Sequence, residues 1–143
     1  MDKRYYEGEM DPKKDAQLIF NQLFIEEQKD IGLTKEISTC LYRKVLYDKN
    51  KPFAYIEAYE YLTTKIVITG GVLPEYRKQK YASLLVNSLI KWFIMTPYET
   101  LMIRVKNSIS HKLARTCGFA YSHFIPVKST TIYAITNPSL IYL

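Results

Sequence analysis

Three consecutive strand patterns followed by alternating strand and helix patterns constrain this chain more than any other feature. Segments 41–47, 52–61 and 64–72 are rich in Tyr, Ile, Val and Thr, which strands favour. Short connections at 48–51 and 62–63 separate them, so we expect a strand hairpin there. Gly70-Gly71 interrupts the last segment and predicts a bulge or a close backbone approach by a ligand.

The remaining patterns complete a mixed α/β order in a single domain over residues 1–143. Asp11-Pro12 predicts a helix start, and apolar residues from Ala16 to Phe24 follow at helical spacing, with Gly32 as a stop. A short strand at 3–7 and a short helix at 35–40 are further expectations. The second half predicts helices at 79–95 and 109–117, and strands at 100–106, 119–126 and 130–135.

Composition excludes several classes of protein. The 143 residues are 48% hydrophobic and 24% charged, as in an ordinary globular domain rather than a disordered chain. Two cysteines and two histidines give neither a disulfide framework nor a metal-binding pattern, so no metal is expected. The N-terminus is polar and densely charged, and no apolar run approaches the ~18 residues of a membrane span. We therefore expect a cytoplasmic protein with reduced thiols and no membrane partner.

Charge is distributed unevenly along the chain. Residues 61–143 carry ten Lys and Arg against two acids, Glu75 and Glu99, whereas residues 1–60 carry ten bases and twelve acids. A local positive field suggests a polyanionic ligand such as nucleic acid, a membrane surface or a phosphate-bearing cofactor, although solubility is the simpler explanation.

Two strand–helix junctions could carry chemistry. In the first, a strand ends at Val72, a basic loop follows, and a helix begins near Gln79. A helix N-terminus with unpaired N–H groups binds phosphate well, and Arg77, Lys78 and Lys80 add charge there. In the second, Asn107 and Ser108 lie between a strand and a helix, where such residues most often cap the helix.

Together the two junctions resemble the GNAT superfamily of N-acetyltransferases. The resemblance covers roughly residues 66–120 and rests on Val72, Pro74, Tyr76, Arg77, Tyr81, Ala82, Asn107, Ser110, Gly118 and Phe119. It implies a central mixed, mostly antiparallel β-sheet flanked by helices, and acetyl-CoA as co-substrate. The positions implied to hold the cofactor are Gly71, Val72, Leu73, Arg77, Lys78, Gln79, Lys80, Tyr81, Ala82, Asn107 and Ser110.

Two positions depart from the family's pattern. The signature loop R/Q-x-x-G-x-G/A reads Arg77-x-x-Lys80-x-Ala82, so Lys80 replaces the usual glycine. The general-acid Tyr that the family often places seven residues after the Asn is Ala114 here.

The resemblance implies acetyl transfer to a primary amine by direct attack on the thioester, with backbone N–H groups near Gly70–Val72 polarising its carbonyl. No enzyme nucleophile is needed, so Cys40 and Cys117 are interpreted as small core residues. Candidate bases are Glu57 and Glu60, which have opposite strand parity. Candidate acids for the thiolate are Ser110, Tyr121 and Tyr133, and His111 is expected to be an exposed helix residue.

Two other functions remain open at this point. The chain could be a CoA-binding regulatory module that has lost turnover, since Lys80 and Ala114 depart from the pattern. It could instead bind nucleic acid through its basic half, although no recognition signature for it is present. The acceptor, a small molecule or a protein amine, is not specified, and either a monomer or a homodimer is expected.

Overall fold

The computed structural model describes residues 11–23, 39–105 and 108–138. Its helical segments are α1 (Pro12–Leu23), η2 (Pro74–Tyr76), α2 (Tyr81–Phe93), α3 (Ser108–Thr116) and η3 (Pro126–Lys128). Its strands are β1 (Cys40–Asp48), β2 (Lys51–Leu62), β3 (Lys65–Val72), β4 (Thr100–Val105), β5 (Ala120–Ile125) and β6 (Thr130–Thr136).

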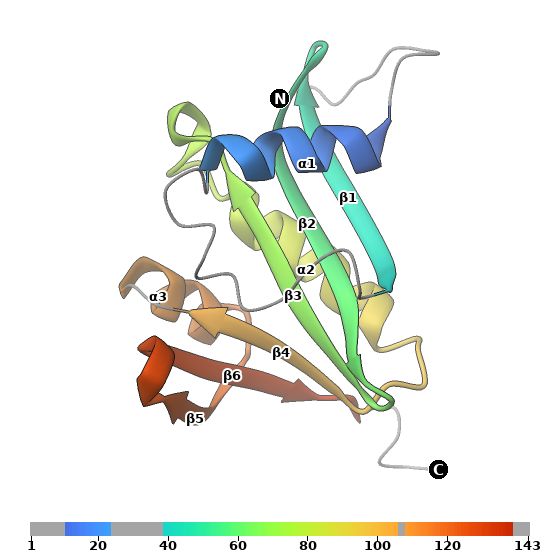
Figure 1. Ribbon diagram of the computed structural model, residues 1–143, viewed down its shortest axis with the longest axis vertical. Helices are drawn as coiled ribbons and strands as arrows, with labels where there is room; N and C mark the ends of the chain where they lie inside the picture. The colour runs from blue at the N-terminus through green and yellow to red at the C-terminus, as the bar shows by residue number, and fades with distance from the viewer. Residues whose placement is uncertain (1–10, 24–38, 106–107, 139–143) are drawn as a thin grey trace.

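The six strands form one sheet in the order β1-β2-β3-β4-β6-β5 (Figure 1). The β3–β4 pair is parallel, and the four other neighbouring pairs are antiparallel. This mixed, mostly antiparallel sheet with helices on both faces confirms the predicted fold class.

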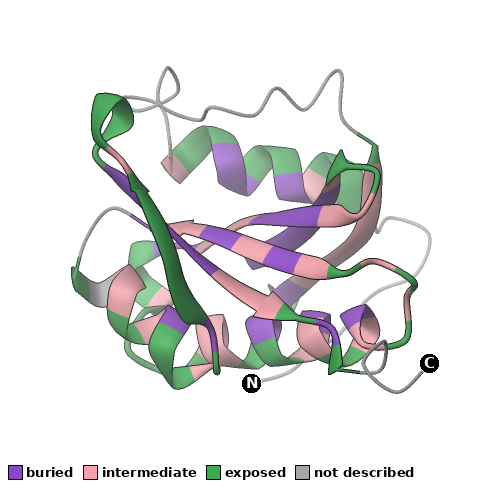
Figure 2. Ribbon diagram, turned by 90° about the horizontal axis from the view of Figure 1, so that it is seen from below, coloured by how far each residue is buried: buried purple, intermediate pink, exposed green. Residues whose placement is uncertain are grey.

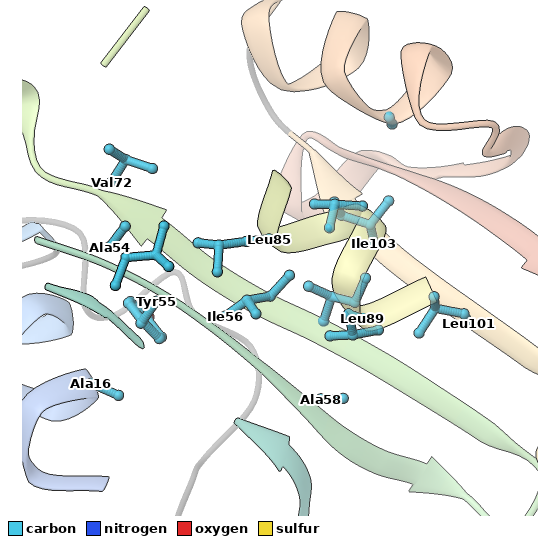
Figure 3. Packing of buried hydrophobic residues seen from close by; sticks show 14 of the residues in the cluster. Ala16, Ala54, Tyr55, Ile56, Ala58, Val72, Leu85, Leu89, Leu101 and Ile103 are labelled. Carbon is cyan, nitrogen blue, oxygen red and sulfur yellow. The ribbon is translucent and has the colours of Figure 1, made fainter. Parts of the chain in front are cut away.

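The two faces of the sheet have different helical covers. Tyr55 lies toward Ala16 of α1, whereas Ile56 lies toward Leu85 and Leu89 of α2 (Figure 3). Because side chains alternate along a strand, residues that share parity with Tyr55 point to the α1 side. We call the two sides of the sheet the α1 face and the α2 face.

The core lies on both faces of β2 and β3. Helix α1 begins as predicted, since the Lys14 N–H donates to Asp11 Oδ1 at 3.2 Å, and its Ile19 and Phe20 are buried. The α2 face holds the buried residues Leu85, Leu89 and Phe93 of α2. Strand β5, by contrast, is exposed along nearly its whole length at the sheet edge (Figure 2).

A buried asparagine holds the connection between α2 and β4. Asn137 is fully buried, and its Nδ2 donates to the carbonyl oxygens of Phe93, Thr96 and Tyr98 at 3.0–3.2 Å. The residue that follows β6 therefore closes the far end of the sheet.

Several expectations need correction. Cys40 belongs to β1, not to a short helix; residues 35–38 of that helix, the strand at 3–7 and Gly32 lie outside the described residues. No bulge occurs at Gly70-Gly71, because β2 and β3 pair without a shift from Ala54↔Val72 to Glu60↔Ile66. The register shift lies instead near the hairpin, between Glu60 and Leu62.

Candidate active site

The parallel strands β3 and β4 separate beyond four paired positions. Their pairing runs from Lys65↔Thr100 to Ile68↔Ile103 and then stops, although both strands continue (Figure 1). From residue 69 onward, β4 therefore no longer pairs with β3 along the β3 edge that is opposite β2. The sheet opens here, next to the junction that the sequence singled out.

The backbone pattern shows which groups face this opening. The N–H of Leu73 donates to the carbonyl oxygen of Phe53 on β2 at 2.8 Å. Residues two apart in a strand direct their N–H groups to the same edge, so those of Gly70 and Val72 point away from β2. The glycine at position 70 has a structural reason, because an added Cβ would lie 2.6 Å from the Tyr55 carbonyl oxygen. The close approach predicted for this segment is thus made by the chain's own β2.

The basic loop after β3 is tied to the strand and to the β1–β2 hairpin. Arg77 Nε donates to the Val72 carbonyl oxygen at 2.9 Å. The Tyr76 ring stacks on Phe53 with centroids 4.1 Å apart, and its hydroxyl donates to Asp48 at 2.8 Å. An exposed ion pair between Lys51 and Glu75, 3.2 Å long, adds a weaker link. The loop is consequently held in one place before α2 begins.

Two lysines of this loop have left-handed backbone conformations. Lys78 has φ of 66° and Lys80 of 67°, a region that favours glycine. Lys80 therefore keeps the backbone conformation that a glycine would adopt most easily, and adds an ammonium group.

The N-terminus of α2 is left without a side-chain cap. Lys80 is the N-cap residue and makes no capping hydrogen bond through its side chain. Leu84 N donates to the Lys80 carbonyl, so the N–H groups of Tyr81, Ala82 and Ser83 precede the first intrahelical bond. With Arg77, Lys78 and Lys80 beside it, this N-terminus has the charge and donors that a phosphate needs.

A buried ion pair lies on the α1 face beside the opening. Arg43 on β1 pairs with Glu57 on β2, and Glu57 pairs with Thr69, the first residue of β3 beyond the β4 pairing. Arg43 Nε donates to Glu57 Oε2 at 2.7 Å, and the Tyr59 hydroxyl donates to Glu57 Oε1 at 2.8 Å. The Glu57 side chain is 2% exposed, so its charge is balanced by Arg43 within the protein.

Burial and this carboxylate shape the titration of the neighbouring groups. Burial, together with the charge of Glu57, raises the pKa of Tyr59 far above its ordinary value. Burial alone would lower the pKa of Arg43, but the hydrogen bond to Glu57 and the charges of Cys40, Glu57 and Tyr59 together outweigh it, and the pKa is raised. Burial also raises the pKa values of Cys40 and Cys117, so neither thiol is activated as a nucleophile.

The other predicted candidates lie elsewhere. Glu60 has the opposite parity to Glu57 and pairs with Ile66, nearer the hairpin. Tyr121 is 62% exposed on β5, which β6 separates from β4. Ser110 is half-buried on α3, one turn before the fully buried Ala114, and Asn107 lies outside the described residues.

His111 is not the exposed helix residue that the sequence suggested. It is half-buried, and its Nδ1 lies 3.0 Å from the hydroxyl of Tyr133, to which Arg115 also donates at 2.9 Å. The buried Tyr133 thus joins β6 to α3. Its partners Arg115 and His111 lie 18 and 22 positions away in the sequence, so no local pattern indicated these contacts.

Two kinds of feature are absent from the described residues. They contain no group of His, Cys, Asp and Glu that could hold a metal ion. None of the helices that the structure describes is long and apolar enough to cross a membrane.

Comparison with known proteins gives one family. The model of the acetyltransferase (GNAT) family matches residues 4–119. No curated protein matches the chain.

Solved structures share the fold at low sequence identity. An N-acetyltransferase from Staphylococcus aureus Mu50 is 16% identical, with a TM-score of 0.69 over 87% of this chain and 93% of that chain. An acetyltransferase from Salmonella typhimurium, solved with its cofactor acetyl-CoA, is 12% identical, with a TM-score of 0.67 over 89% and 90%. A phosphinothricin acetyltransferase from Sinorhizobium meliloti, in complex with AcCoA, is 14% identical, with a TM-score of 0.58 over 66% and 60%. The chain thus spans less than two thirds of the length of some of these relatives.

Proposed function

This chain belongs to the GNAT family of acetyltransferases, and on that basis we propose that it transfers an acetyl group from acetyl-CoA to a primary amine. The amine nitrogen attacks the thioester carbonyl, the new C–N bond forms, and the C–S bond breaks. The ammonium form of the acceptor loses one proton to a base before the attack, and its nitrogen loses a second as the amide forms. The departing thiolate gains one proton to become CoA, and the other passes to solvent. No covalent enzyme intermediate is required, in agreement with the raised thiol pKa values of Cys40 and Cys117.

The observation that carries the proposal is the basic junction between β3 and α2. The uncapped N-terminus of α2 offers the N–H groups of Tyr81, Ala82 and Ser83 to the pyrophosphate, beside Lys78 and Lys80. Gly71, Val72, Leu73, Arg77 and Gln79 complete the proposed cofactor segment, and Ser110 on α3 is a further proposed contact. Asn107, which the resemblance also implies, lies outside the described residues. Arg77 acts in part by holding the loop against Val72.

The backbone edge of β3 would polarise the thioester carbonyl. The N–H groups of Gly70 and Val72 face the opening, where β4 no longer pairs with β3. Donors fixed in this way stabilise the oxyanion of a tetrahedral intermediate without reorganisation.

Glu57 is the residue that we assign as the base. Of the two predicted carboxylates, Glu57 is the one that pairs with Thr69 at the opening, whereas Glu60 lies on the other face of the sheet and nearer the hairpin. Because Glu57 is 2% exposed, the proton would reach it through an intervening water molecule. Ala114 replaces the usual tyrosine, so Ser110, one turn earlier on α3, is the acid that we propose for the thiolate.

A screen of primary amines with acetyl-CoA, read by release of free CoA thiol, tests the proposal. Turnover with at least one amine above the rate of spontaneous hydrolysis supports it. CoA binding without turnover on any amine would favour the regulatory module instead. Salt-sensitive binding of an oligonucleotide without CoA binding would favour the nucleic-acid reading.

A further inference from the structure

Arg43 is only partly used by its buried partner. Its Nε donates to Glu57, and no described residue accepts a hydrogen bond from Nη1 or Nη2 of its guanidinium. The Arg43 side chain is 23% exposed, whereas that of Glu57 is 2% exposed. Glu57 thus holds the guanidinium through Nε. The two terminal nitrogens Nη1 and Nη2, which we call the fork, make no hydrogen bond to Glu57.

The position of this fork relates it to the acceptor. Arg43, Glu57 and Thr69 form one row across β1, β2 and β3 on the α1 face. The phosphate-binding helix α2 covers the opposite face, where Lys44 of β1 contacts its Ser88. An amine that approaches the thioester from the side away from α2 would therefore meet the α1 face. The part of the acceptor that does not react would then lie within two strand spacings, or about 10 Å, of Arg43.

A second arginine lies on the same face of the sheet. Arg104 of β4 shares the face with Arg43, because it has the opposite parity to Leu101 and Ile103, which pack toward α2 (Figure 3). Glu57, the carboxylate between these two arginines, forms its ion pair with Arg43. Both guanidinium groups therefore belong to the face that the acceptor would meet.

From these contacts we infer that the acceptor is an amino acid or a small derivative of one, and that Arg43 binds its carboxylate. A guanidinium fork matches the two oxygens of a carboxylate, and its planar geometry fixes the acceptor as well as attracting it. The buried Glu57 and the Tyr59 hydroxyl hold the fork in place beforehand, which lowers the cost of ordering it on binding. This inference rests on the proposed acetyl transfer and names the class of amine that it uses.

Matched pairs of amino acid and decarboxylated amine test the assignment, for example tyrosine with tyramine and ornithine with putrescine. Each pair keeps an amine and differs by the carboxylate. We expect the carboxylated member to have a kcat/KM roughly tenfold or more above that of its partner, since hydrogen bonds to charged groups are among the stronger ones. The control is Arg115→Lys, the same exchange on the α2 face, where Arg115 contacts Tyr133.

Arg43→Lys is the decisive variant, because an ammonium still balances the buried Glu57 but has no fork. It should raise KM for the amino acids and bring the ratio within each pair toward one, while Arg115→Lys keeps the wild-type ratio. An equal loss for both members of a pair would show that Arg43 acts only through Glu57 or the fold and would overturn the inference. Preference for the decarboxylated member would overturn it as well.

Binding measurements separate failure of this inference from failure of the proposed function. Calorimetry with tyrosine and ornithine on the CoA-bound protein should show binding that Arg43→Lys weakens. Turnover of amines without any such binding overturns the inference and leaves acetyl transfer intact. Absence of turnover on every amine refutes the proposed function. In that case, amino-acid binding that depends on Arg43 would still support the carboxylate site, and lack of such binding would refute the site as well.

Discussion

The guanidinium of Arg77 donates to the carbonyl oxygen of Val72, so the first residue of the loop signature is fixed to the strand end that precedes it. This bond places the loop beside the point where β3 and β4 separate, and the hairpin residues Asp48 and Phe53 support it from the other side through Tyr76. The geometry of the proposed phosphate site therefore depends on contacts outside the signature.

Arg77→Glu should weaken CoA binding far more than Arg115→Glu, although both variants change the charge by two units. The first variant loses the bond to Val72 and brings a carboxylate to the phosphate site, whereas Arg115 lies late in α3 and contacts Tyr133. Calorimetry with CoA gives the two dissociation constants. Equal losses would mean that only the overall positive field attracts the cofactor.

Substitutions of Lys80 separate its charge from its backbone conformation. Lys80→Gly relieves a left-handed φ of 67° and should stabilise the ligand-free protein by about 1 kcal/mol, whereas Lys80→Ala keeps the strain. If the ammonium meets phosphate, both variants should raise the dissociation constant for CoA about tenfold. Tighter CoA binding by Lys80→Gly would instead identify Lys80 as an obstruction.

The strand patterns and the two strand–helix junctions were predictable because they depend on local periodicity and on residues that are close in sequence. The Arg43–Glu57 pair was not, since it joins residues fourteen positions apart and exists only in one register of β1 against β2. The same holds for the Asp48–Tyr76 contact, which links the hairpin to the loop.

The predicted bulge at Gly70-Gly71 was wrong for a physical reason. Paired glycines in a strand indicate that some group comes close to the backbone, but they do not identify that group. Here it is the Tyr55 carbonyl oxygen of β2, which lies close to position 70. The left-handed conformation of Lys78 had no signal either, because glycine is the residue that usually marks such a position, whereas Lys80 stands where the loop signature has its glycine.

The buried tyrosine beside Glu57 predicts a loss of stability at alkaline pH. Since the pKa of Tyr59 is raised in the folded protein, the folded state keeps its proton above pH ~10, where the unfolded chain loses it. The contribution of Tyr59 to the free energy of unfolding should thus be constant below that pH, and it should fall as the pH rises above it.

Tyr59→Phe tests the origin of this slope by urea denaturation at pH 8 and pH 11. It should cost about 1–3 kcal/mol at pH 8, because Glu57 Oε1 loses a donor, and it should make the alkaline fall shallower. Tyr121→Phe, on the exposed edge strand, is the control and should keep the wild-type slope. An unchanged slope in Tyr59→Phe would contradict the assignment.

Asn137→Ala should destabilise the fold by about 1–3 kcal/mol, because three carbonyl oxygens at the α2–β4 connection lose their shared donor. Asn21→Ala, which removes an exposed bond to Gln17, should have little effect. Urea denaturation of both variants provides the comparison, and equal stabilities would show that the buried amide contributes nothing.

The central claim is that the junction between β3 and α2 binds the phosphates of acetyl-CoA. Thermal melting with CoA, against pantetheine as the control that lacks the phosphates, tests it directly. At a CoA concentration of about 100 times the dissociation constant, binding should add about 2.7 kcal/mol to the unfolding free energy and raise the melting temperature. Pantetheine at the same concentration should give a much smaller increase. No shift at millimolar CoA, or equal shifts with both compounds, would contradict the phosphate site.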